Sequence, residues 1–415
     1  MKSCFQPAEI LLPEHTIEKS KWAVIACDQF TSQQDYWSEV ERYVGSACST
    51  LHIIFPEIYL GNDSDRTQRI QKIQNNMEIY LKERTLETTV SSGYILVERV
   101  TKSGVRIGLV GQIDLEQYDF DPRHKALVRA TEGTVLSRIP PRVAIRKDAK
   151  IEIPHVMLLF DDPEKQILEP LYERRGELKM LYDTELMLDG GHVRGFAVEH
   201  GEAEAVTAEF ERMQTESDGF LFAVGDGNHS LAAAKACWEA VKQGLSPDAA
   251  AVHPARYALV EVVNLHSPAL CFEPIHRLLL HTELSGLMEY FQKKLNGQGM
   301  DMEDGEEIIF SQGERMTGIR IRGRGERLPV EILQGFLDDY LMENPEVQID
   351  YIHGRESLEE LEKETGGCGI YLQSIDKRML FPAIRAGGVL PRKTFSIGEA
   401  REKRYYMECK KLWEN

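Results

Sequence analysis

The sequence predicts a mixed α/β to α+β protein built from two domains. Its 415 residues exceed what one compact core usually holds. Strand-like and helix-like segments alternate along the whole chain, which is typical of mixed fold classes. Past about residue 282 the chain changes character, because a helical segment is followed there by a Gly/Asp/Glu-rich stretch. We therefore expect an N-terminal core domain over residues 1–282 and a smaller α+β domain over residues 283–415.

The spacing of apolar residues predicts the elements in order. Apolar residues three or four apart indicate helices, and alternating or short continuous apolar runs indicate strands. The clearest hairpin turns at Gly104. In the first domain we expect strands at 22–26, 51–55, 92–100, 105–113, 151–160 and 256–263, and helices at 33–44, 65–82, 167–181 and 202–215. In the second domain we expect a helix at 284–295, two alternating strands, and helices near 333–341 and 358–365.

The composition of the chain limits the kinds of molecule that we expect it to bind. The chain carries 49 Lys and Arg against 67 Asp and Glu, a net charge of −18, which disfavours binding to nucleic acid or to an anionic membrane. No apolar stretch is long enough to span a bilayer, and the N-terminus lacks the apolar core of a signal peptide. The seven cysteines are dispersed and form no C-x-x-C pair, so we expect reduced thiols. We predict a cytoplasmic protein that acts on a small molecule, with its oligomeric state left open.

The most informative segment is a strand, a glycine turn and a helix start within residues 220–235. An apolar run meets Gly225, Asp226, Gly227 and Asn228, and a Leu/Ala-rich helical stretch follows at once. Glycine permits backbone angles closed to other residues and leaves room for a second molecule to approach the main chain. The first amides of a helix lack intrahelical acceptors, and the helix dipole adds positive charge there. A phosphate group is the ligand that suits such a place.

A histidine at this turn strengthens the prediction of a ligand site. A turn needs no imidazole, whereas His229 beside other polar groups supplies a donor or a titratable group. The alternative is ordinary turn chemistry, in which Asn228 or Ser230 only caps the helix.

The segment before the turn reverses the sign of the chain's charge. Seven Arg or Lys residues lie within residues 123–147, among them Arg138 and Arg142. Most such runs are solvated helix faces. Glu132, however, is flanked by glycine and threonines rather than by a salt-bridging repeat, which fits an acidic residue held at a turn that faces a basic pocket.

Six short motifs, in order, carry a resemblance to a known family. They are Trp-Ala-Val-Ile-Ala-Cys-Asp at 22–28, Phe-Pro-Glu at 55–57, Thr-Glu-Gly-Thr at 131–134, Gly-Asp-Gly-Asn-His-Ser at 225–230, Pro-Ile-His-Arg at 274–277 and Gly-Gly-Val-Leu-Pro-Arg-Lys-Thr at 387–394. Together they resemble the family called domain of unknown function 1015 over nearly the whole chain.

The glycine turn is also similar to the phosphate-binding box of the ParB/sulfiredoxin-like superfamily, which includes nucleotide-hydrolysing partition proteins and kinases that phosphorylate free serine. This likeness implies a ParB/sulfiredoxin-like nucleotide-binding core that uses ATP or another nucleoside phosphate with Mg²⁺. The basic residue that often follows the histidine is absent here, which leaves phosphate neutralisation to Arg138, Arg142 or Lys235. The reactive cysteine of sulfiredoxin is absent too, so reduction of oxidised cysteine is the least expected chemistry.

The first functional hypothesis is an ATP-dependent phosphotransferase that acts on a small hydroxylated metabolite, with free L-serine as the acceptor implied by the likeness. A carboxylate suffices as general base, a role we give to Glu132. Asp226 would hold Mg²⁺, and His229 would act at the reacting phosphate. The residues expected to bind the nucleotide are Gly225, Gly227, Asn228, His229, Ser230, Arg138 and Arg142.

The second hypothesis is a nucleotide or anion sensor without turnover, which needs the same turn and no base. A serine hydrolase that uses Ser230 is disfavoured because the chain has no G-x-S-x-G elbow. His276, Arg277 and Lys393 are the remaining unusual groups. We expect Arg277 and Lys393 either at a cleft between the domains or as ordinary cations in solvent.

Overall fold

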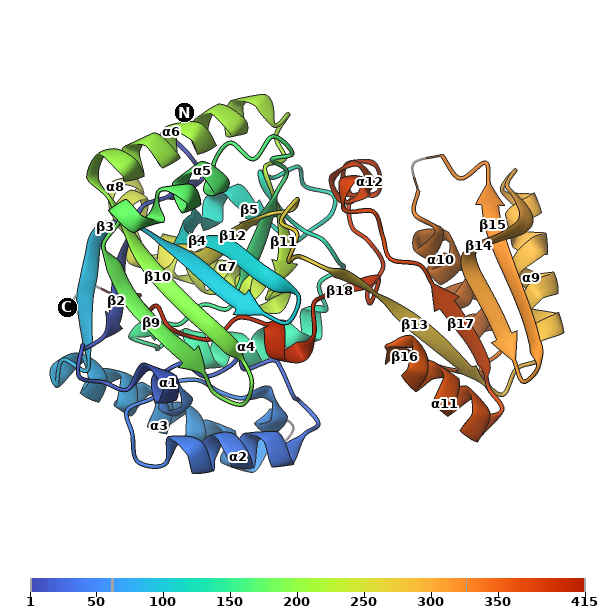
Figure 1. Ribbon diagram of the computed structural model, residues 1–415, viewed down its shortest axis with the longest axis horizontal. Helices are drawn as coiled ribbons and strands as arrows, with labels where there is room; N and C mark the ends of the chain where they lie inside the picture. Colours follow the sequence, from blue (N-terminus) through green and yellow to red (C-terminus); the bar gives the residue numbers. More distant parts are fainter. Residues whose placement is uncertain (1, 61–62, 326, 414–415) are drawn as a thin grey trace. The chain divides into compact units, whose positions relative to one another are not determined.

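The computed structural model describes residues 2–60, 63–325 and 327–413, and it divides the chain into two compact units (Figure 1). The first unit comprises Met1–Leu270 and Gly398–Asn415, and the second comprises Cys271–Ile397. The mixed α/β class expected from the sequence is confirmed. The division differs from the expected boundary at residue 282, because strand β13 (Phe272–Leu280) already belongs to the sheet of the second unit and the C-terminal segment returns to the first.

The first unit is built on one large sheet. Its main path runs β5-β6-β11-β8-β12-β4-β3-β10-β9, and β1 and β2 pair with β4 and β3. In that order the strands are β5 (Tyr118–Asp119), β6 (Val128–Ala130), β11 (Phe222–Asp226), β8 (Met157–Phe160), β12 (Tyr257–Asn264), β4 (Gly104–Asp114), β3 (Leu86–Thr101), β10 (Gly191–Glu199) and β9 (Met180–Leu186), with β1 (Phe5–Gln6) and β2 (Ala8–Pro13) beside them. The expected hairpin is β3 and β4, paired antiparallel from Ile95–Val110 to Thr101–Gly104.

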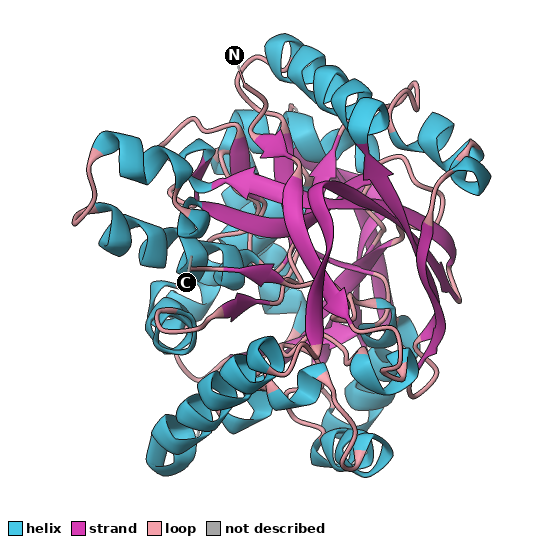
Figure 2. Cartoon of the chain, turned by 90° about the vertical axis from the view of Figure 1, so that its left-hand side faces the viewer, coloured by secondary structure: helices cyan, strands magenta, loops and turns pink. Residues whose placement is uncertain are grey.

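Helices surround this sheet, and Figure 2 shows the strands in the middle of the view with helices around them. They are α1 (Lys19–Trp22), α2 (Gln34–Val44), α3 (Asp63–Lys82), α4 (Ile139–Arg146), α5 (Leu168–Glu173), α6 (His200–Glu216), α7 (Asn228–Lys242) and α8 (Pro247–Val252). Successive residues of β3 contribute to different apolar clusters, as expected when side chains alternate between the faces of a sheet. Ile95 packs in the cluster that holds Trp22, and Leu96 packs in the cluster that holds Trp238.

Several expected elements are corrected by the structure. Residues 22–26 are not a strand, since α1 ends at Trp22 and only Ile25 forms a bridge, with Tyr405. Residues 51–55 are not a strand either, because the 3-10 turn Thr50–His52 includes the first two of them. The expected helix at 167–181 is shorter, since α5 ends at Glu173 and β9 starts at Met180. Short buried apolar runs have no periodicity that separates a strand from coil, which explains these errors.

The expected strand at 151–160 is interrupted. Its two parts are β7 (Ile151–Glu152), which pairs with β19 (Lys410–Lys411), and β8, which pairs with β11 and β12. The residues between them, Ile153 to Val156, leave the ladder and include His155.

The second unit holds its own sheet, in the order β15-β14-β17-β13-β16, with β18 paired to β13. Besides β13 the strands are β14 (Asp301–Gln312), β15 (Arg315–Arg322), β16 (Gln348–His353), β17 (Cys368–Leu372) and β18 (Phe395–Ile397), and the helices are α9 (Leu284–Gly297), α10 (Pro329–Glu343), α11 (Arg355–Thr365) and α12 (Leu380–Gly387). None of the helices in the described part of the chain combines the length and apolarity that a bilayer crossing requires.

Candidate functional site

The glycine turn connects β11 to α7, as the sequence predicts. Gly225 lies where the register of β11 against β8 shifts between Val224 and Asp226, an irregularity that glycine accommodates. Gly227 has φ of +78° and precedes the first residue of α7. A Cβ at Gly227 would lie 3.0 Å from Cα of Val156. On the side where a Cβ would lie, the space beside Gly227 is thus filled by Val156 and His155, and the role of this glycine in ligand binding stays a prediction.

The start of α7 has no side-chain cap. Asp226 Oδ1 accepts from the Gly227 N–H at 3.0 Å, outside the helix, and the Leu231 N–H donates to the Gly227 carbonyl at 3.0 Å as a normal helical bond. The Oδ1 atom of Asn228 is buried and has no hydrogen-bond partner among the described residues. A buried amide oxygen without a partner is costly, so this atom is a candidate contact for a ligand donor or a cation.

The loop that contains Glu132 lies across the start of α7. Asn228 Nδ2 donates to the Glu132 carbonyl at 3.2 Å and to Thr134 Oγ1 at 3.1 Å. The Val135 N–H donates to His229 Nε2 at 3.1 Å, so a neutral His229 carries its proton on Nδ1. The structure thus brings the main chain at Glu132 to the turn, 96 residues away in sequence.

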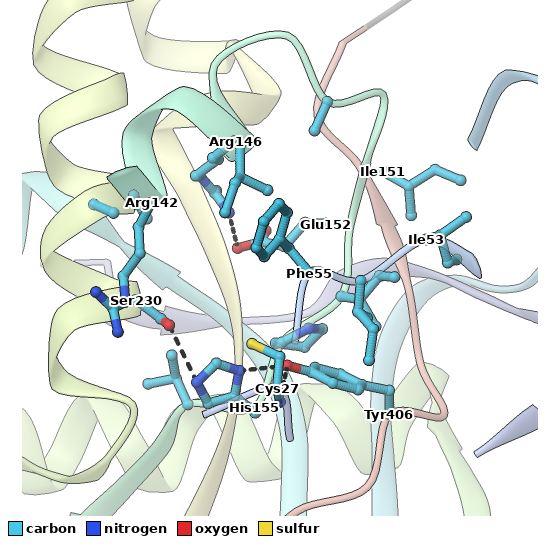
Figure 3. Close-up of a pocket in the computed structure, with 18 of the residues that line it drawn as sticks. Cys27, Ile53, Phe55, Arg142, Arg146, Ile151, Glu152, His155, Ser230 and Tyr406 are labelled. Atoms are coloured by element: carbon cyan, nitrogen blue, oxygen red, sulfur yellow. Dashed lines mark hydrogen bonds and ion pairs between the residues drawn. The ribbon is translucent and has the colours of Figure 1, made fainter. Parts of the chain in front are cut away.

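A second histidine, which sequence reasoning missed, lies beneath the turn. His155 Nε2 lies 3.1 Å from Ser230 Oγ and 3.3 Å from Asp28 Oδ2, and its Nδ1 lies 2.8 Å from the hydroxyl of Tyr406 (Figure 3). Tyr406 also accepts from the Cys27 N–H at 3.0 Å. The side chain of His155 is only 5% exposed.

The charged groups around His155 determine its protonation state. Burial lowers the pKa of His155, but the attraction of Asp28, followed by Asp226 and Glu57, outweighs burial, so the pKa of His155 is raised. Burial raises the pKa of Asp28, yet the nearby His155 reverses this and holds the pKa of Asp28 below its usual range. A carboxylate facing Nε2 keeps a proton on that nitrogen, so His155 donates to Ser230 and does not deprotonate it. This geometry supports the sequence argument against a serine hydrolase, in which the histidine must accept the serine proton.

Further ion pairs border the same site. Lys403 Nζ lies 3.4 Å from Asp226 Oδ2, and Arg142 pairs with Glu57. Burial raises the pKa of Glu57 despite the opposing effect of Arg142. Arg146 binds Glu152 at 2.7 Å. Among the expected phosphate ligands, Arg142 is thus engaged by a carboxylate of the protein.

Arg138 is less directly placed than the other expected ligands. It is exposed, and its carbonyl accepts from Arg142 at 2.7 Å. Lys235, named as a third cation, donates to the Leu115 carbonyl at 2.9 Å and pairs with Glu239 at 2.8 Å. Lys403 is the cation that sequence reasoning missed, because it lies in the C-terminal segment that was assigned to the other domain.

A cavity of about 140 Å³ opens beside Ser230 and His155. Its lining joins residues from the loop at 53–60, from α4, from residues 151–156 and from α7. Cys27 also lines it, and burial, followed by the repulsion of Asp28, raises the pKa of its thiol, as expected of a structural cysteine.

His276 and Arg277 make contacts within the second unit. His276 Nδ1 accepts from the Leu372 N–H at 3.2 Å, and Arg277 donates through Nε to Gln334 at 3.1 Å. The guanidinium of Arg277 also lies 4.9 Å from the ring centre of Tyr351. Both residues are buried there, whereas Lys393 is exposed.

Comparison with known proteins identifies the family. A model described as a protein of unknown function, DUF1015, matches residues 10–340. The chain belongs to the DUF1015 family. This confirms the resemblance that the six sequence motifs carry. No curated protein sequence matches the chain.

Solved structures show only distant similarity. A free serine kinase variant in complex with AMP is 12% identical, with a TM-score of 0.39 over 72% of this chain and 91% of that chain. A conserved hypothetical protein from Pyrococcus furiosus is 10% identical, with a TM-score of 0.35 over 72% and 94%. SbnI with a C-terminal truncation, from Staphylococcus aureus, is 7% identical, with a TM-score of 0.37 over 70% and 82%.

Proposed function

We propose that the first unit binds a nucleoside phosphate, with ATP as the first candidate, at the start of α7 and transfers a phosphoryl group to a small hydroxylated metabolite. Free L-serine is one acceptor to be tested. The observation that carries this proposal is the uncapped start of α7 with the buried, unpartnered Oδ1 of Asn228 beside it. The first-turn amides of a helix and the helix dipole favour a phosphate at such a position.

The donor atoms at the turn fit Mg²⁺. Asp226 offers a carboxylate and Asn228 an amide oxygen, the oxygen ligands that Mg²⁺ prefers. No cluster of three or more His, Cys, Asp or Glu suited to a metal occurs among residues 2–60, 63–325 and 327–413. Mg²⁺ commonly takes its remaining ligands from phosphate oxygens and water, so two protein oxygens suffice. When bound, the ion would neutralise phosphate charge, and Lys403, displaced from Asp226, would add a second positive charge.

In the proposed chemical step, Glu132 is the general base. The acceptor oxygen bonds to the γ-phosphorus, the bond from that phosphorus to the bridging β–γ oxygen breaks, and the acceptor proton passes to the Glu132 carboxylate. Positioning and charge stabilisation account for most of the catalysis in such transfers. His229, held by the Val135 N–H, would orient a phosphate oxygen through its Nδ1 proton.

A sensor without turnover is the second candidate. One observation favours it: Arg142 and Asp226 already have partners of opposite charge in Glu57 and Lys403, so the site is neutralised before a ligand arrives. Such a site binds an anion by exchanging partners and needs no general base.

Replacement of Glu132 separates the two candidates. A general base contributes roughly 10²–10⁴-fold to rate and little to ground-state binding, so Glu132→Gln should keep ATP affinity and lose most turnover. The assay follows labelled γ-phosphate from ATP into serine, threonine, homoserine, glycerate and neutral alcohols, with calorimetry for ATP binding. Glu360→Gln, an exposed change on α11, is the matched control. ATP binding without transfer to any acceptor would leave only the sensor, and equal rates in wild type and Glu132→Gln would remove Glu132 as the base.

A further inference from the structure

The cavity beside the glycine turn has walls that are mainly aliphatic. One polar part of the lining is formed by Ser230, His155, Glu57 and Arg142, and another by Arg146 and Glu152. Figure 3 shows Ile53, Phe55 and Ile151 facing the same space. The residues that form the apolar walls are Ile53, Ile54, Phe55, Leu60, Met77, Ile145, Ala149, Ile151, Ile153, Pro154, Val156, Leu231, Ala233, Ala234 and Ala258. An ionised group placed among such side chains would lose its hydration without a replacement.

The charged side chains of the lining do not change this conclusion, because they neutralise one another. Arg142 pairs with Glu57, and Arg146 with Glu152. The two pairs therefore carry no net charge, and Arg146 Nη2 remains as a buried donor without a hydrogen-bond partner among the described residues. A neutral, apolar group is the one that gains from entering the cavity.

The polar end of the cavity presents a hydrogen-bond donor. Asp28 keeps a proton on His155 Nε2, and Ser230 Oγ accepts that proton's hydrogen bond at 3.1 Å. No other side-chain hydrogen bond of Ser230 occurs in the described part of the chain, so its hydroxyl proton is free to donate. An alcohol oxygen beside Ser230 would accept this bond.

The volume limits the size of the occupant. An engineered apolar cavity of about 150 Å³ binds benzene, so a cavity of about 140 Å³ accommodates a group of roughly six heavy atoms. Ser230, in the first turn of the helix whose start is the proposed phosphate site, lines this cavity. An alcohol whose oxygen is bound by Ser230 would thus lie at the start of that helix.

We propose that this cavity is the acceptor subsite and that it selects a small neutral alcohol with an apolar body of about six heavy atoms, its oxygen bound by Ser230. The proposal rests on the proposed phosphoryl transfer for the fate of that oxygen. It narrows the acceptor class, because serine, whose ammonium and carboxylate would both enter the cavity, is disfavoured.

Binding to the full-length chain tests the subsite without turnover. Three probes are compared. Benzyl alcohol has both the apolar ring and the hydroxyl, toluene has the ring without the hydroxyl, and glycerol has hydroxyls without an apolar ring. Calorimetry and ligand-observed NMR should show benzyl alcohol bound most tightly, toluene more weakly, and glycerol and serine not at all. Ser230→Ala should reduce the preference for benzyl alcohol over toluene by about two- to tenfold, the worth of one hydrogen bond. Equal binding of glycerol or serine and benzyl alcohol would overturn the proposal.

Two substitutions in the cavity wall test whether the alcohol binds inside the cavity. Ala234→Leu fills the space and should lower benzyl alcohol affinity at least tenfold while ATP affinity is kept. Ile151→Ala enlarges the space and should shift the preference toward 2-phenylethanol, which keeps the test decisive if the filled variant does not fold. Loss of ATP affinity in Ala234→Leu would show that the cavity holds the nucleobase and would overturn the proposal. Binding of benzyl alcohol without phosphoryl transfer to any alcohol would refute the proposed kinase activity and leave the subsite standing.

Discussion

Two groups of charged side chains are buried in the first unit, and they differ in what lies beside them. The cavity cluster comprises Asp28, Glu57, Arg142 and His155, with Asp226 and Lys403 adjoining, and it borders about 140 Å³ of space. The tail cluster comprises Arg99, Arg106, Glu261, Arg404 and Glu408, and the space beside it is only about 20 Å³.

The tail cluster serves to hold the C-terminal segment. Arg404 pairs with both Glu261 and Glu408, and these three side chains are at most 4% exposed. Arg99 donates to the Lys403 carbonyl at 3.0 Å, and Arg106 donates to the Glu402 carbonyl at 2.9 Å. Except for the Arg404–Glu408 pair, which lies within the tail, these contacts join the tail to the sheet. Burial of charge alone therefore does not mark a ligand site, and neither does an unpartnered acceptor, since Glu261 Oε1 in the tail cluster is buried without a hydrogen-bond partner as well. The cavity cluster differs by the larger space at its side.

We expect the largest loss of stability from a substitution that disrupts the tail cluster. Arg404→Met leaves the carboxylates of Glu261 and Glu408 buried without their main partner, which costs about 3–5 kcal/mol of unfolding free energy for a buried ion pair. Urea denaturation measures the loss. Arg401→Met is the control, because Arg401 lies in the same segment but is 40% exposed, and its loss should stay within about 1 kcal/mol. A similar loss in both variants would show that the tail is held by its backbone contacts instead.

The second effect concerns the turn that supports the cavity cluster. Gly227→Ala places a Cβ 3.0 Å from Cα of Val156 at φ of +78°, so we expect a loss of about 1–3 kcal/mol. The control is Gly201→Ala in α6, where nothing lies within 4 Å of the new Cβ and alanine favours the helix. Equal stability of Gly227→Ala and wild type would mean that the turn relaxes, and its role in positioning residues 155–156 would be refuted.

The third effect is the pH dependence of the cavity cluster. The pKa of His155 is raised by folding, so its contribution to stability is complete below the unfolded pKa of about 6.5 and is lost as pH rises through the folded pKa. The pKa of Asp28 is lowered, so its contribution is present above about pH 3.9 and is lost as pH falls through the folded pKa. Urea denaturation from pH 5 to 9 should show wild type losing stability above pH 6.5 relative to His155→Gln. Parallel pH curves for the two proteins would contradict the raised pKa.

Sequence reasoning found one half of the candidate site. The strand, turn and helix at residues 222–242 follow from local signals, since glycine angles, helix propensity and apolar spacing all act within a few residues. His155 and Asp28 gave no such signal. His155 lies in the short break between β7 and β8, and Asp28 follows a buried segment that has no ladder, so only the assembled sheet brings them to Ser230.

Tyr406 and Lys403 were missed for a related reason. Both come from the C-terminal segment, which belongs to the first unit although it follows the whole second unit in the sequence. Nothing local in that segment predicts its return. Hydrogen bonds with residues 250 to 385 positions earlier hold it there. The same long-range pairing explains why the expected domain boundary placed this segment wrongly.

The smallest expected effect on stability comes from Lys403, which joins the two clusters. Its backbone carbonyl accepts from Arg99 in the tail cluster, while its ammonium group faces Asp226 at the glycine turn. Lys403→Met keeps the carbonyl and removes only the charge. Asp226 is 20% exposed and keeps the hydrogen bond from the Gly227 N–H, so we expect a loss of about 1 kcal/mol in unfolding free energy, the worth of one hydrogen bond. If the ammonium group turns to a bound phosphate, ATP affinity should fall about tenfold or more, the worth of a charge-assisted hydrogen bond. Lys411→Met, which removes a half-exposed charge paired with Glu9, is the control and should change neither quantity. A stability loss as large as that of Arg404→Met, with ATP affinity unchanged, would assign Lys403 to the tail cluster alone and remove it from the phosphate site.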